Sequence, residues 1–91
     1  MKLQWLPKAI ANREAQISYI AKDNPLAAIS QGDLIAEQVD MLLQHPKMGR
    51  IGRKKETREL VISRTPFIVV YRIKGTHIEV IRLLHTSQQW P

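Results

Sequence analysis

The sequence predicts a single α+β domain, residues 1–91, in which an antiparallel twisted sheet packs against an N-terminal helical hairpin in the order β-α-α-β-β-β. Two observations predict this fold. Residues 7–44 place apolar side chains at helical spacing, whereas residues 58–85 contain three β-branched runs separated by turn signals. Because helices and strands occupy separate parts of the chain, we expect one helical layer on one sheet.

The first elements are a short strand and a helix. Lys2–Leu6 is a strand candidate because Leu3 and Trp5 alternate with polar residues, and we expect Trp5 to join the core. Pro7 suits the first turn of a helix, where its missing N–H has no partner to lose. Pro25 ends this helix, since the residue before a proline is pushed out of the α region.

A second helix is expected from Pro25 to about Gln44, with Asn24 as its cap. The connection is so short that the two helices should form an antiparallel hairpin. The segment from Lys47 to Lys55 contains two glycines and five basic residues, and it is typical of a loop.

Three strands are predicted in the last third of the chain: Arg58–Ser63, Phe67–Ile73 and His77–His85. The nearly continuous apolar run of Phe67–Ile73 is expected at the centre of the sheet. Tyr71 lies within that run, so we interpret it as a core residue whose hydroxyl is hydrogen-bonded. His77–His85 alternates imperfectly between apolar and polar residues.

Positive charge is concentrated in the second half of the chain. The net charge is +6; residues 45–91 carry ten basic residues against three acidic ones, and residues 1–44 carry four against five. Such asymmetry indicates a face that binds an anionic partner, either a nucleic acid or an acidic protein.

Composition excludes several classes of site. The chain has no cysteine, so it forms neither a disulfide nor a thiolate metal site. His45 and His77 lack metal-ligand spacing, and we expect no metal and no cofactor. No apolar run reaches about 18 residues, and no signal peptide is recognised, so we expect a cytoplasmic protein without a membrane partner.

Five segments together resemble the toxins of the RelE/ParE superfamily from bacterial type II toxin–antitoxin modules. They read LQWLPKA, YIAKDNPLAA, HPKMGRIGR, TRELVISRTPFIVVYRI and IEVIRLLHTSQQWP. The resemblance covers essentially the whole chain and includes the order of elements. It implies a compact toxin that halts growth when free and is neutralised by a small antitoxin encoded beside it.

The superfamily implies two mechanisms. RelE-like members cleave mRNA in the ribosomal A site, and ParE-like members are thought to poison DNA gyrase. Metal-free RNA cleavage needs a base, an acid and a cation that stabilises the phosphorane. The residues available for a nuclease are Arg58, Glu59, Arg82 and His85.

Departures from the RelE-like pattern favour the gyrase mechanism, although whether the chain is an enzyme stays open at this point. RelE-like nucleases resemble one another in placing a tyrosine, or a tyrosine with a histidine, near the end of the last strand. Here Leu84, His85 and Thr86 stand there, and the only late aromatic is Trp90, which cannot transfer protons. His85 can equally be a structural residue.

The partner surface is expected to include basic residues and the tail. The candidates for binding the target or the antitoxin are Arg50, Arg53, Lys54, Lys55, Arg64, Arg72 and Trp90. Alternatively, Arg72 and Arg82 form ion pairs with Glu59 or Glu79. The antitoxin should be acidic, disordered alone, and folded on binding as a helix, with or without an added strand at a sheet edge. The resemblance implies that operator DNA is contacted only through the antitoxin.

Overall fold

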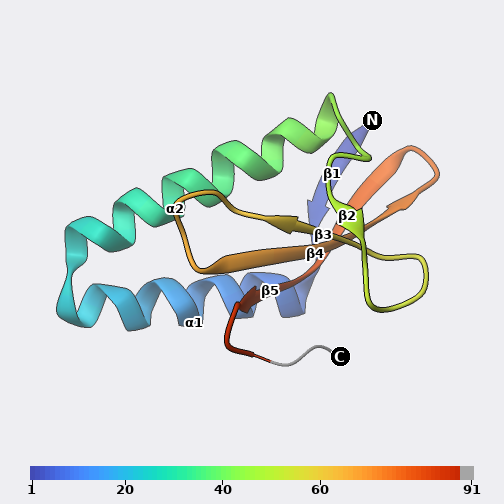
Figure 1. The fold of residues 1–91 in the computed structure, drawn as a ribbon. Helices are drawn as coiled ribbons and strands as arrows, with labels where there is room; N and C mark the ends of the chain where they lie inside the picture. The colour runs from blue at the N-terminus through green and yellow to red at the C-terminus, as the bar shows by residue number, and fades with distance from the viewer. Residues whose placement is uncertain (89–91) are drawn as a thin grey trace.

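The computed structural model describes residues 1–88 and confirms the predicted α+β fold, with a helical hairpin packed on a five-stranded sheet (Figure 1). The elements are β1 (Lys2–Trp5), α1 (Pro7–Asp23), α2 (Pro25–Asp40), the 3₁₀ helix η1 (Met41–Leu43), β2 (Arg50–Ile51), β3 (Arg58–Val61), β4 (Phe67–Lys74) and β5 (His77–His85). Figure 1 shows the turn between the helices at one end of the molecule and the β4–β5 turn at the other. No helix within residues 1–88 is long and apolar enough to cross a membrane.

The helical hairpin depends on Asn24, as predicted. The backbone N–H of Asn24 donates to the Ile20 carbonyl at the end of α1, and its side chain accepts a hydrogen bond from the Ala27 N–H at 3.1 Å at the start of α2. The second helix was expected to continue to about Gln44, but α2 ends at Asp40. The chain then tightens into η1, where the Gln44 N–H bonds the Met41 carbonyl three residues back.

The sheet has the order β1-β5-β4-β3-β2 and is antiparallel except at one edge. There, β1 pairs with β5 in parallel, with Leu3 opposite Ile78 and Trp5 opposite Val80, so the sheet is mixed. A parallel pair needs a long connection, which the helices and the other strands provide. The predicted central position of β4 is confirmed, since β3 and β5 flank it and Phe67–Tyr71 is buried.

Two local features were not expected. Arg50–Ile51 lies in the segment interpreted as a loop, but it forms β2 and pairs with Glu59 and Arg58 of β3. The register between β4 and β5 shifts at Val70/Tyr71: Val70 lies opposite Arg82, and Tyr71 lies opposite Val80. Ile81 is therefore the extra residue of a bulge, which explains the imperfect alternation along β5.

The core lies between the helices and one face of the sheet. Ile35 and Val39 of α2 join Leu60, Val69 and Tyr71 there, and all five are buried. Trp5 is only half-buried; it packs against this core, and the Arg13 guanidinium carbon lies 4.3 Å from the centre of its ring. This cation–π contact covers the outer face of the ring.

Candidate functional site

Tyr71 fixes the segment that follows the helices. Its ring is fully buried; its hydroxyl donates to the Pro46 carbonyl at 2.6 Å and accepts from the Gly49 N–H at 2.9 Å. Burial raises the pKa of Tyr71, against the opposing effects of the Gly49 hydrogen bond and the Arg58 charge. The hydroxyl therefore stays protonated and serves as a hydrogen-bonding group of the core, as predicted from its position in the strand.

Replacing Tyr71 with phenylalanine should lower the free energy of unfolding by about 2 kcal/mol, because a buried N–H and a carbonyl each lose a partner. Urea denaturation measures this change. The matched control is Tyr19→Phe, since Tyr19 is 71% exposed and its hydroxyl has no partner among the described residues. Equal stabilities of the two variants would show that the Tyr71 hydroxyl does not support the fold.

Glu59 collects two arginines from the preceding segment. Its carboxylate is 2% exposed; Arg50 Nη2 donates to it at 3.1 Å, Arg53 Nε at 3.1 Å, and the Arg53 backbone N–H at 3.0 Å. Burial opposes ionisation of Glu59, but the hydrogen bonds from Arg53 and Arg50 outweigh that effect, so its pKa lies below the usual 4.5. The arginine side chains themselves stay 59% and 49% exposed.

Arg58 and Glu59 alternate along β3, as the sequence predicts, so they lie on opposite faces of the sheet. Arg58 shares its face with the core residue Leu60. Its Nη1 donates to the Gly49 carbonyl at 2.8 Å and to the Lys47 carbonyl at 3.4 Å. Arg58 thus holds the same segment that Tyr71 holds.

The other two nuclease candidates lie on β5. Arg82 Nε donates to Asn12 Oδ1 of α1 at 2.9 Å. The His85 ring packs edge-on against Phe67, with 5.9 Å between ring centres, and its Nδ1 accepts from the Ser87 N–H at 3.1 Å.

The four nuclease candidates are not brought together. His85 lies opposite Phe67 on β4, whereas Arg58 lies opposite Tyr71, four residues farther along that strand. At about 3.3 Å per residue this step alone is roughly 13 Å. Glu59, on the opposite face from Arg58, is already engaged by Arg50 and Arg53.

The remaining predicted binding residues differ in their surroundings. Lys54, Lys55 and Arg64 are exposed, and Arg64 has a φ of 67°, which is unusual for a residue with a side chain. Arg72 Nε forms an ion pair with Glu79 at 2.6 Å, which confirms one of the two alternatives drawn from the sequence. Trp90 lies outside the described residues.

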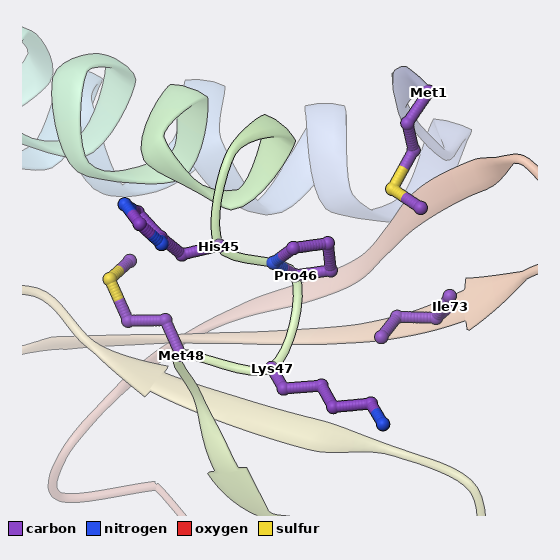
Figure 2. A pocket seen from close by; sticks show the side chains of 6 residues that line it. All are labelled: Met1, His45, Pro46, Lys47, Met48 and Ile73. Atoms are coloured by element: carbon purple, nitrogen blue, oxygen red, sulfur yellow. The ribbon is translucent and has the colours of Figure 1, made fainter.

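Two hollows meet at Met48. The first, about 620 Å³, is nearly all apolar; Figure 2 shows Met1 and Ile73 on one side of it and His45, Pro46, Lys47 and Met48 on the other. The second, which we call the edge groove, lies between α2 and β3. It is lined by Glu37, Gln38, Met41, Met48, Leu60, Val61, Ser63 and Arg64.

The family model described as "ParE toxin of type II toxin-antitoxin system, parDE" matches residues 3–90. The chain belongs to the ParE toxin family. A curated relative of this ParE-family toxin, "Putative toxin Y4kP" from Sinorhizobium fredii, is 39% identical over 90 residues, which cover 99% of this chain and 93% of that protein. The solved structure "Chromosomal ParDE TA system from P. aeruginosa" is 30% identical, with a TM-score of 0.85; the match covers 93% of this chain and 95% of that chain.

Sequence reasoning missed several residues of the ParE-family toxin that shape its surface. Gln38, Met48 and Val61 line the edge groove, and none of them carries a recognisable chemical motif. Asn12 anchors Arg82 across 70 residues of chain. Only the bulge-prone alternation of β5 hinted at this end of the sheet. Within residues 1–88 no three His, Asp or Glu side chains gather in a way that could hold a metal ion.

Proposed function

We propose that this ParE-family toxin inhibits growth by binding and poisoning DNA gyrase in the cytoplasm, without chemistry of its own. The observation that carries the proposal is the dispersal of the residues that RNA cleavage would need. Glu59 is held by two arginines, Arg58 holds backbone carbonyls, and His85 packs on Phe67 at the far end of β4. A general base, an acid and a phosphorane-stabilising cation must all reach one phosphate.

The partner that neutralises the toxin is an acidic antitoxin. The solved relative from P. aeruginosa belongs to a chromosomal ParDE toxin–antitoxin system, which supports this partner. The surface supports it too, because exposed basic residues lie beside the apolar hollow and the edge groove. An amphipathic acidic segment satisfies both kinds of surface. Contact with operator DNA then occurs through the antitoxin.

Two assays with the purified chain test the mechanism. In the first, purified gyrase supercoils a plasmid, and we expect the toxin to inhibit supercoiling and to accumulate cleaved DNA. In the second, a reconstituted translation reaction is read for mRNA ends, and we expect no toxin-dependent cuts. Codon-phased mRNA cuts without cleaved DNA would overturn the proposal in favour of ribosome-dependent RNA cleavage.

His85 offers a residue-level test of the same question. His85→Asn removes the imidazole but leaves a side-chain oxygen that can accept from the Ser87 N–H. We expect this variant to stop growth as the wild type does. A loss of toxicity of about two orders of magnitude or more in a variant with unchanged thermal unfolding, the scale expected for a lost proton-transfer group, would instead indicate a catalytic role.

A further inference from the structure

The outer edge of β3 carries one unpaired backbone position. The Ile62 N–H donates to the Phe67 carbonyl of β4 at 3.0 Å, so the backbone groups of Val61 and Ser63 point away from β4. On that outer side, Glu59 pairs with Arg50 of β2, where the two-residue strand ends. The N–H and carbonyl of Val61 have no strand or side-chain partner among the described residues.

Gln38 occupies the next position along this edge. Its Nε2 donates to the Ser63 carbonyl at 3.2 Å, and the Ser63 N–H donates to its Oε1 at 2.7 Å. A carboxamide presents the same donor and acceptor as a peptide group, so Gln38 stands where a neighbouring strand would continue. Open strand edges pair readily with other chains, and such covers are one way in which proteins limit this.

The side chains around the open position suit an extended apolar segment. Met41, Met48 and Val61 are 48%, 39% and 49% exposed, and all three line the edge groove. Arg64 lies at the end of the groove in a left-handed backbone conformation, which costs about 1–3 kcal/mol for a residue with a Cβ. A strained residue whose side chain is exposed at a groove is a candidate for contact with a partner.

We infer that an extended acidic segment of the antitoxin adds to this edge as a sixth strand, pairing with Val61 and replacing Gln38 at Ser63. This inference rests on the proposed function. The occupant is a strand because what the edge lacks is a backbone donor and acceptor, and a helix has already used its own. The segment is acidic because it lies beside Arg64, on the half of the chain whose charge is +7 from ten basic and three acidic residues.

The decisive variant is Val61→Pro. Proline removes the outward N–H of Val61, keeps the β3–β4 bonds, and is tolerated on edge strands. The matched control Val61→Thr keeps the N–H and the β-branched shape. Binding is measured by calorimetry against the acidic protein encoded beside this chain. We expect Val61→Pro to weaken binding about tenfold or more and Val61→Thr to change it by less than about threefold.

A second variant and a second readout test the replacement of Gln38. Gln38→Leu cannot bond Ser63, so the antitoxin has nothing to displace, and we expect its affinity to be equal or higher. Amide hydrogen exchange at Val61 and Ser63 should slow by about tenfold or more in the complex, corresponding to about 1.4 kcal/mol of added protection.

The outcomes separate this inference from the proposed function. If the wild-type chain does not bind the neighbouring acidic protein, both fail. If the wild type binds it but folded Val61→Pro binds equally well, or if the Val61 amide exchanges at the same rate in the complex, only the added strand is overturned. A tenfold loss of affinity in Gln38→Leu would contradict the replacement at Ser63.

Discussion

Replacing Gly49 with alanine should lower the free energy of unfolding by about 3 kcal/mol or more. A Cβ at this position would stand 2.6 Å from Tyr71 Cε1, 2.7 Å from the Tyr71 hydroxyl and 3.0 Å from the Glu59 carbonyl. The Tyr71 ring is fully buried and its hydroxyl is bonded on both sides, and the carbonyl belongs to a paired strand. Neither neighbour can move away cheaply.

Gly32→Ala is the matched control for this substitution. The nearest atom to a Cβ at Gly32 is Ile17 Cδ1 at 3.8 Å, an ordinary contact, and Gly32 lies inside α2. Alanine is the better helix former, so this variant should be more stable by about 0.5–1 kcal/mol. Urea unfolding of both proteins gives the comparison. A Gly49→Ala protein as stable as the wild type would mean that the segment after the helices is not held by Tyr71.

Replacing Glu59 with alanine should cost about 2–3 kcal/mol of stability. Three hydrogen bonds from Arg50 and Arg53 end on this carboxylate, and two of them come from charged side chains. The loss stays below the value for a fully buried pair because both guanidinium groups are about half exposed and regain water. Glu79→Ala is the control, since its ion pair with Arg72 lies nearer the surface, and its loss should be smaller.

The contribution of Glu59 should depend on pH in a definite direction. Its pKa is lower in the folded protein than the usual 4.5, so the unfolded chain binds the proton more readily. The stabilisation is therefore complete above about pH 4.5 and is lost as the pH falls through the folded-state pKa. The stability difference between wild type and Glu59→Ala should shrink in acid. A difference that is constant down to acid denaturation would contradict the ion-pair assignment.

The fold was predictable where a local signal and the global packing agree. Asn24 and Pro25 fix the helical hairpin through a cap and a restricted backbone, both of which act within a few residues. Tyr71 was correctly interpreted as a bonded core residue because it stands inside an apolar strand. The ion pair of Arg72 with Glu79 follows from their opposition across a hairpin.

The features that sequence reasoning missed depend on partners distant along the chain. β2 contains two residues in a glycine-rich basic segment, and it forms because Glu59 and Tyr71 hold that segment from the sheet. The bond between Gln38 and Ser63 joins residues 25 apart, and nothing in either neighbourhood indicates it. The separation of Arg58 from His85 required the register of β4 with both of its neighbours.

The parallel pair of β1 with β5 has a consequence for how the molecule is made. Leu3 waits for Ile78, and Trp5 for Val80, so the first strand to leave the ribosome is paired by the last one described. Contacts this distant in sequence close late because a long loop must be ordered first. Until β5 is synthesised, β1 has no strand to join and β4 has an open edge. A chain whose synthesis stops before β5 therefore lacks the sheet, and a cell does not meet the folded toxin before its final strand.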